Sequence, residues 1–479
     1  QLYGLGEFTT PANGGNTSRI GLDASVPVTA TSSFVATLHP DYSNVEIDQQ
    51  TIAPSAFPRQ FAEVRPFFTQ VNPNFNNSLA CLNCPQTLYT PAIPTFRDGF
   101  AYEGTAGPLS FSAFDTDTRD RTDNAQTVTY VKQDASRVEQ LGVQRVSVNV
   151  PGFENTATTV ASGYENQHSH MLAYLNAGEV TGTGINTRLA RYLEYGLGYQ
   201  TKTTTAIFDM QTVGRQFFPA DGFVNQVDIR GFSFFGGRTI NFSSSAPLHD
   251  IVINGYDDVY RDHHGRLAQV QQGGQVNFDF HDLLSLHVFG GYHAYRTFAG
   301  ELLPFANTGA SLGYKLSTST PQSISFSGGP FYHGNLTSWS YVSTIPAGRG
   351  LSLNAEADEN LYVPRVAAEP VSRQWLERVA LDWQFSKVAS ADVGLRRIIG
   401  RNLPNAFSTP DLPTAAAPLG VVNGFSPFDY VSATNVSFAV HVLLKRQEFY
   451  FVYGDPNSLT TTPALYIKWI HYWGADKGT

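Results

Sequence analysis

The sequence is poor in charge, cysteine and methionine. Of its 479 residues only 15% are charged, and it holds two Cys and two Met, whereas soluble globular chains carry about 25% charged residues. The 40 acidic and 31 basic residues give a net charge of −9, which excludes the basic stripe of a typical nucleic-acid-binding protein. Two cysteines are too few for a disulfide scaffold. No uninterrupted apolar run approaches the roughly 18 residues of a membrane-spanning helix.

The chain is instead rich in aromatic residues, and its apolar residues recur at every second position. Aromatics make up 13% of the sequence, a share that argues against disorder. Apolar and more polar residues alternate in residues 145–150, 226–230, 284–293 and 436–444. Since successive side chains of a strand point to opposite faces, each segment has one apolar and one polar face. In residues 436–444 we expect the even-numbered side chains to face lipid.

The number and length of these segments predict a membrane-spanning barrel. Roughly 20–24 strands of about 10–14 residues are expected, longer than ordinary strands of five or six and close to the 9–11 needed to cross a bilayer obliquely. Short joints such as residues 106–108 and 236–238 alternate with longer loops, including a Pro/Ala-rich loop at residues 402–430. The sequence therefore predicts an all-β fold, a single transmembrane antiparallel β-barrel over residues 1–479, with a long lumenal or loop segment near the N-terminus.

A secreted soluble β-rich binding protein is the non-membrane alternative. A β-propeller would show self-similarity every 40–50 residues or so, and we find no such repeat. Tandem sandwiches would need linkers, and no clear change of composition follows residue 100. Low charge and long two-faced strands favour the barrel.

Three stretches of the sequence carry a resemblance to a known family. They are HPDYSNVEIDQQTIAPSAFPRQFAEVRPFF at residues 39–68, the Asp221-Gly222-Phe223 triplet ahead of a strand, and the end of the chain, VSFAVHVLLKRQEFYFVYGDPNS followed by LYIKWIHYW. In this order they resemble the barrel domain of a mostly uncharacterised family of bacterial outer-membrane proteins. Many of its members carry an N-terminal sandwich like carbohydrate-binding-module family 9. Strand-like alternation begins by about Ile20, so we expect no such sandwich in these 479 residues, and no carbohydrate role follows from the resemblance.

Residues 42–97, the plug segment, are the expected occupant of the lumen. A barrel of 16 or more strands encloses an aqueous space that its own side chains do not fill, and this stretch of over fifty residues shows little alternation. An external surface loop is the alternative. The candidate plug or lumen residues are Glu46, Asp48, Arg59, Glu63, Arg65, Phe67 and Phe68. We expect Arg65 to pair with an acidic residue of the inner wall. By alternation, the candidate inner-wall residues are Gln226, Asp228, Arg230, His287 and His293.

Both cysteines lie in the plug segment, as Cys81-Leu82-Asn83-Cys84. A CxxC pair can be a redox pair, half of a metal site or a small disulfide. Zinc normally takes four ligands and there is no second CxxC, while a thioredoxin-like role needs a βαβ context that is missing. We therefore expect a structural disulfide, which an oxidising compartment allows.

No catalytic motif stands out, so we expect neither an enzyme nor a cofactor or metal site. The sequence lacks a phosphate-binding glycine loop and an H-E-x-x-H motif. Its one G-x-S-x-G string, at residues 309–313, lies in an all-β stretch without the helix that follows a nucleophile elbow. The function expected is that of a plugged or gated channel or transport component of the bacterial outer membrane. Its expected contacts are lipid or lipopolysaccharide and an unknown small solute, with no nucleic acid. We expect a secretory signal to be removed ahead of Gln1. The alternative is a closed barrel that serves as a surface receptor or scaffold for a partner protein in a membrane complex.

Overall fold

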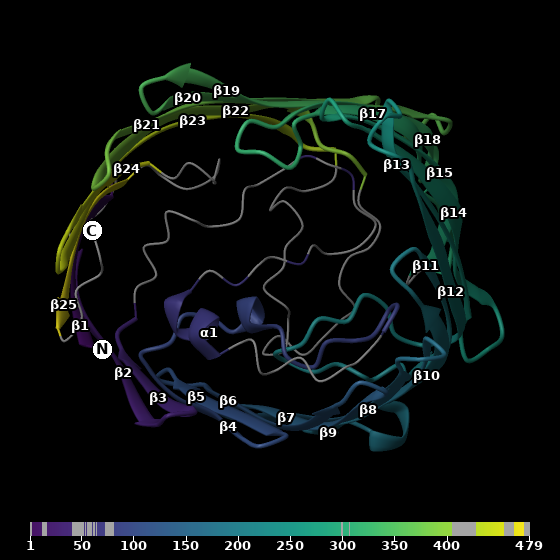
Figure 1. Ribbon diagram of the computed structural model, residues 1–479, viewed down its shortest axis with the longest axis horizontal. Coiled ribbons are helices and arrows are strands. Elements are labelled where there is room, and N and C mark those ends of the chain that lie inside the picture. Colours follow the sequence, from purple (N-terminus) through teal and green to yellow (C-terminus); the bar gives the residue numbers. More distant parts are fainter. Residues whose placement is uncertain are drawn as a thin grey trace.

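The computed structural model describes residues 2–11, 17–40, 52, 54, 60, 63, 65–71, 81–297, 300–305, 307–404, 428–454 and 464–473. These residues form one antiparallel sheet with a short helix and two 3-10 turns (Figure 1). The strands are β1 Leu2–Pro11, β2 Thr17–Thr29, β3 Ser32–Leu38, β4 Asp98–Ala106, β5 Leu109–Asp117, β6 Thr122–Gln133, β7 Arg137–Val150, β8 Phe153–Asn166, β9 Met171–Gly182, β10 Arg191–Gln200, β11 Thr204–Val213, β12 Ile229–Asn241, β13 Leu248–Arg261, β14 Leu267–Phe280, β15 Leu284–Arg296, β16 Leu302–Pro304, β17 Asn307–Tyr314, β18 Gln322–Phe331, β19 Gly334–Gly348, β20 Leu351–Pro364, β21 Ser372–Ser386, β22 Ala389–Arg401, β23 Tyr430–Leu444, β24 Gln447–Tyr453 and β25 Ala464–Trp473. The helix is α1 Pro66–Val71, and the 3-10 turns are η2 Thr90–Ala92 and η3 Thr187–Leu189.

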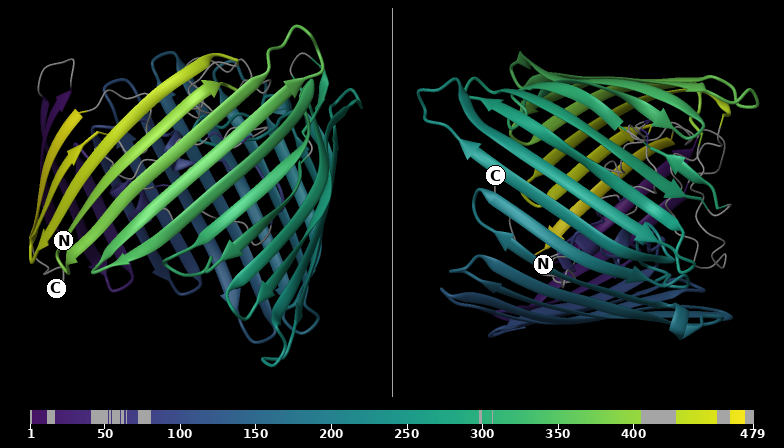
Figure 2. Two further views of the ribbon diagram at one scale, coloured as in Figure 1. Left: turned by 90° about the horizontal axis from the view of Figure 1, so that it is seen from above. Right: turned by 90° about the vertical axis from the view of Figure 1, so that its right-hand side faces the viewer.

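The sheet closes into a barrel. Strands that follow one another in the chain pair with one another, and β1 pairs with β25 as well as with β2. The three-residue β16 and the longer β17 pair with different parts of β15, so 24 positions surround the ring in the described part of the chain. Closure leaves no free edge that could pair with another chain. Figure 2 shows the strands inclined to the barrel axis, and the predicted all-β antiparallel barrel is confirmed.

The two ends of the barrel differ in the length of their connections. At the end where both termini lie, consecutive strands are joined by two to seven residues. We call this the short-turn end. All the long connections lie at the other, long-connection end, and they include residues 39–97, 183–190, 214–228 and 402–429. Unequal ends of this kind are typical of transmembrane barrels.

The outer face of the barrel carries an apolar belt. In β23 the even-numbered Val436 is 49% exposed, whereas the odd-numbered Ser437 and Ala439 are 3% and 8% exposed and face inward. The expected outward orientation of the even-numbered side chains is therefore confirmed at Val436 and at Leu444, which is 47% exposed, while residues 440–443 are all half-buried. Leu197, Phe326 and Trp383, on three other strands, are exposed by half or more of their surface. So much exposed apolar surface is unusual for a soluble monomer.

In the described part of the chain, we find no helix long and apolar enough to cross a membrane.

Near the long-connection end of β7 and β12, apolar side chains lie on the inner face and charged side chains lie on the outer face. In β7, Val146 and Val148 are buried on the inner face, and the exposed Arg145 points outward. In β12, Ile229 is buried and Arg230 is exposed. The prediction of an inner-wall Arg230 is therefore wrong. Alternation separates the two faces of a strand but does not say which face meets lipid. Here the inner face is apolar because it packs against connecting segments inside the barrel.

Two boundaries expected from the sequence also need comment. Residues 236–238 lie inside β12 rather than in a turn, so the prediction of a short joint there is wrong. The two adjacent glycines fit within the strand, and β12 pairs with β13 through them without a register shift. Of the Pro/Ala-rich stretch, only residues 402–404 and 428–430 belong to the described part of the chain.

Candidate functional site

The described part of the plug segment lies inside the ring of strands, where Figure 1 shows α1 close to β3, β4 and β5. Phe67 and Phe68 of α1 are 2% and 0% exposed. They share a hydrophobic cluster with Phe96 of the same segment and with Val35 and Phe114 of the wall. This cluster, which we call the aromatic contact, fixes α1 to the inner face of β3–β7.

Arg65 stabilises the segment from within. Its guanidinium donates to both carboxylate oxygens of Glu63, at 2.9 and 2.8 Å, and to the carbonyls of Ile93, at 2.8 Å, and of Thr90. It also lies 4.4 Å from the centre of the Phe68 ring. The expectation that Arg65 pairs with an acidic wall residue is therefore wrong, because a carboxylate two residues away reaches it in a bidentate arrangement.

A second contact joins the plug segment to the connection between β11 and β12. Gln86 and Phe223 exchange backbone hydrogen bonds of 2.9 and 2.8 Å, and Tyr89 donates its backbone N–H to the carbonyl of Asp221 at 2.6 Å. The rings of Tyr89 and Phe223 lie edge to face with centroids 5.3 Å apart. Residues 221–223 thus act as a short extra strand for the segment.

A buried ion network holds that connection in place. Arg121, in the turn after β5, donates to Asp123 at 2.6 Å and to Asp221 at 2.5 Å. Asp221 is 1% exposed. Burial raises the pKa of the Asp221 carboxyl well above its usual value, and the neighbouring Asp123 charge adds to the effect while Arg121 opposes it. One guanidinium therefore serves two buried carboxyl groups.

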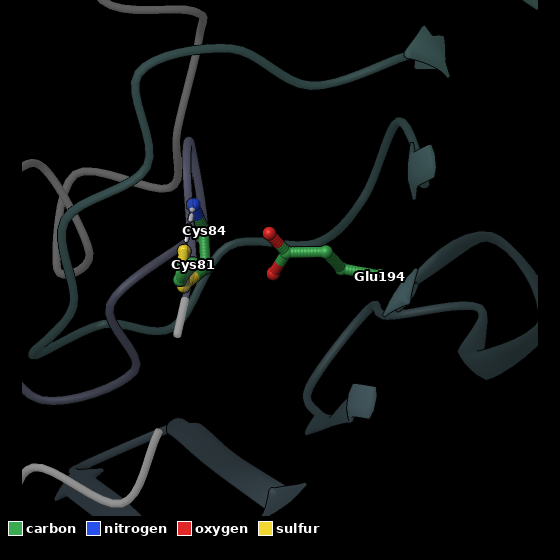
Figure 3. A group of neighbouring side chains, drawn as sticks. All are labelled: Cys81, Cys84 and Glu194. Atoms are coloured by element: carbon green, nitrogen blue, oxygen red, sulfur yellow. Dashed lines mark hydrogen bonds between the residues drawn. A yellow bond between two sulfur atoms is a disulfide. The ribbon is translucent and has the colours of Figure 1, made fainter. Parts of the chain in front are cut away.

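A third contact is made by the loop of residues 81–84. Cys81 and Cys84 form a disulfide, and Figure 3 shows the carboxylate of Glu194, on β10, pointing toward the sulfur atoms. The loop is fastened to the wall through Asn83, whose side chain donates to Ser233 at 2.9 Å and whose carbonyl accepts from Gln211 at 2.8 Å.

The remaining candidates lie in several places. His293 and His287 lie on the inner face of β13–β15. A ring nitrogen of His293 lies 2.7 Å from the Tyr256 hydroxyl. A ring nitrogen of His287 lies 3.2 Å from the Gln275 side-chain oxygen. The expected wall positions of Gln226 and Asp228 are wrong, because β12 begins only at Ile229 and both residues belong to the preceding connection. Asp228 contacts His263 there. Glu46, Asp48 and Arg59 lie outside the described residues.

Sequence reasoning missed the acidic residues of the inner wall. Glu194, Asp209 and Asp258 are 0%, 1% and 8% exposed. A signal for Glu194 exists, because in residues 191–200 the odd-numbered Leu and Tyr side chains form an apolar face and place the glutamate on the other one. For Asp221 the sequence offers only the Asp-Gly-Phe triplet and no sign of its buried partner Arg121.

Comparison with known proteins gives no family. No family model matches the sequence, and no curated protein matches it either. Among solved structures the chain is similar to the siderophore receptor PirA from Pseudomonas aeruginosa, with 9% identity over 98% of this chain and 80% of that one and a TM-score of 0.49. PirA from Acinetobacter baumannii gives 9% identity, the same coverage and a TM-score of 0.46. A variant of the ferric enterobactin receptor PfeA from Pseudomonas aeruginosa gives 8%, the same coverage and 0.44.

Proposed function

We propose that this chain is a gated channel or transport component of a bacterial outer membrane, and that the plug segment closes its lumen. The observation that carries the proposal is the position of α1 and residues 81–97 inside the ring. Two contacts join this segment to the inner wall and a third joins it to the connection between β11 and β12. The solute is a small polar molecule that passes when the segment rearranges.

The outer surface supports the placement in a membrane. Strands of 13 to 15 residues such as β12 and β23 rise by about 3.3 Å per residue and span roughly 30–35 Å when tilted by about 40°. This matches the hydrocarbon thickness of about 30 Å. The apolar belt then meets lipid, and the polar residues of the inner face meet water.

The size of the ring supports the need for an occluding segment. With 24 wall positions spaced about 4.8 Å apart and tilted by about 40°, the backbone ring is on the order of 45 Å across. Side chains of the wall reach only a fraction of that distance. The plug segment is the longest connection of the described fold and is the natural occupant.

The decisive experiment removes the segment without disturbing the wall. Leu38 and Asp98 are paired across β3 and β4, and His39 donates its backbone N–H to the carbonyl of Arg97 at 2.6 Å. Residues 40–96 can therefore be replaced by Asn-Gly, which favours a two-residue hairpin turn. The shortened protein keeps every wall strand.

We expect the shortened protein to fold, with unchanged β circular dichroism and heat-modifiable migration, and to give a large steady conductance in planar bilayers where the intact protein is nearly closed. A correctly folded deletion variant with the conductance of the intact protein would place the segment outside the permeation path. That outcome would favour a closed barrel that acts as a receptor or scaffold.

A further inference from the structure

The loop of residues 81–84 brings two sulfur atoms and a buried carboxylate together at the inner wall. The Sγ atoms of Cys81 and Cys84 and a carboxylate oxygen of Glu194 all lie within 4.8 Å of one another. The ligand atoms of a tetrahedral zinc site are roughly 3.5 Å apart. The two sulfurs, which are bonded to each other here, would move apart after reduction, and the carboxylate oxygen would approach them. The loop can supply this movement because it belongs to no strand.

One oxygen of the Glu194 carboxylate is buried and makes no hydrogen bond within the described part of the chain. Glu194 is 0% exposed, and Asn176 donates to its Oε2 at 3.2 Å, while Oε1 has no hydrogen-bond partner in the described structure. A buried polar atom without a partner costs about 1–3 kcal/mol. Such an atom beside two sulfurs is the second, independent sign of a ligand position.

Asp209, on the neighbouring β11, also has one buried carboxylate oxygen that makes no hydrogen bond with a described residue. Tyr174 donates its hydroxyl to Oδ2 of Asp209 at 2.9 Å, and Oδ1 is left without a partner. Tyr174 reaches this carboxylate across Gly196, where an added Cβ would lie only 2.6 Å from the Tyr174 hydroxyl. The absence of a side chain at Gly196 thus keeps the carboxylate of Asp209 oriented by a tyrosine on its far side.

We propose that the reduced form of this loop binds a thiophilic divalent cation, with Cys81, Cys84 and Glu194 as ligands and Asp209 or a water in the fourth position. Two thiolates and a carboxylate suit zinc better than the hard cations magnesium and calcium, which prefer oxygen. The disulfide and the metal are alternatives at one place, so the oxidation state of the loop decides whether a metal binds.

The exchange between the two forms balances with a phosphine reductant. The phosphine takes up the oxygen of one water molecule and becomes a phosphine oxide. Its two electrons break the bond between the sulfurs, and the two protons of that water end on the two thiols. The cation then displaces both protons and forms two bonds to sulfur.

The test uses the full-length chain refolded in detergent, with Co²⁺ as the probe and Zn²⁺ as the competitor. We expect one Co²⁺ per reduced chain, with thiolate-to-cobalt charge-transfer absorption, and no binding to the oxidised chain. Cys81→Ser should lose the charge-transfer band. Glu194→Gln should bind at least about tenfold more weakly. Glu179→Gln is the matched control, because Glu179 lies on the adjacent β9 and pairs with the exposed Arg191 at 2.7 Å.

The comparison of oxidised and reduced wild-type protein needs no substitution and stays informative if a variant fails to fold. Absence of a stoichiometric Co²⁺ complex in the reduced wild type would overturn the proposal. Equal affinity of wild type and a folded Glu194→Gln would remove the carboxylate from the site. Neither result depends on whether the barrel conducts.

Discussion

Replacing Phe68 by alanine should release the plug segment while leaving the barrel intact. The Phe68 ring is 0% exposed, and its centroid lies 5.1 Å from Phe67, 5.6 Å from Phe96 and 5.3 Å from Phe114. Arg65 lies over its face. Removing a buried phenylalanine side chain costs about 3–5 kcal/mol.

The cost falls on docking rather than on the wall. Phe68 belongs to α1, whereas the wall strands are held by their own ladders. A loss of about 3–5 kcal/mol raises the undocked fraction of the segment by roughly 10²–10⁴-fold, since each 1.4 kcal/mol is a factor of ten. A rise of this size brings a rare opening into measurable range.

Limited proteolysis of the folded protein measures the undocked fraction when opening and closing are faster than cleavage. We expect cleavage within residues 81–97 to accelerate by that factor in Phe68→Ala, together with more frequent openings in planar bilayers. Gln70→Ala is the control, because Gln70 is an exposed residue of the same helix. If Phe68→Ala lowered the global unfolding free energy by the full amount and left cleavage unchanged, Phe68 would belong to the core of the barrel and the reasoning would fail.

Three further predictions concern the wall and the long-connection end. Val440→Arg, on the lipid face of β23, should destabilise the barrel by about 2–4 kcal/mol near mid-bilayer. A polar residue at the inward Ala439 should cost less. Equal penalties at the two positions in unfolding titrations would contradict the assignment of the faces. Arg121→Met should cost about 3–5 kcal/mol because it leaves two buried carboxyl groups without their cation, and it should exceed the effect of Asp221→Asn in the same titrations. His333 is hydrogen-bonded to Glu369, in the connection after β20, and to Glu301. The bond to Glu369, with a smaller contribution from Glu301, raises the pKa of His333 above its ordinary value despite partial desolvation. The protonated form is therefore the one that stabilises the fold, fully so below the unfolded pKa, and this contribution disappears as the pH rises through the folded pKa. The stability difference between wild type and His333→Gln should accordingly be larger at about pH 5.5 than at about pH 8.5, and a difference independent of pH would refute the pairing.

The wall could be predicted from the sequence because period-two alternation is a local property of each strand. Residues 284–293 and 436–444 show the expected faces for this reason. At Arg230 the same alternation misleads, because the identity of the inner face depends on what fills the barrel, and that is decided by residues far away in the chain. The pairing of Arg65 with Glu63 depends on a turn whose geometry no periodicity encodes.

The importance of Glu194 also depends on distant residues. Its strand and face can be read from the neighbouring Leu and Tyr side chains, but the sulfurs opposite it come from a loop more than a hundred residues earlier. Asp221 meets Arg121 in the same way, across 100 positions of the chain. Sequence patterns give the strands of this molecule; contacts made inside the ring require the closed fold.

The attachment of the plug segment has a mechanical consequence. The chain leaves the wall at Leu38 and returns at Asp98, and these two residues are paired neighbours at the same rim of the barrel, next to the hydrogen bond from His39 to Arg97. A force applied to either end of the chain is borne by the ladders of β1, β2 and β25 before it reaches the segment. The segment is covalently attached at one place on the rim, so a pull on either end of the chain is not transmitted directly to it. In the proposed function, the work that opens the lumen must therefore act on the segment itself, through contacts from the lumen or from the rim.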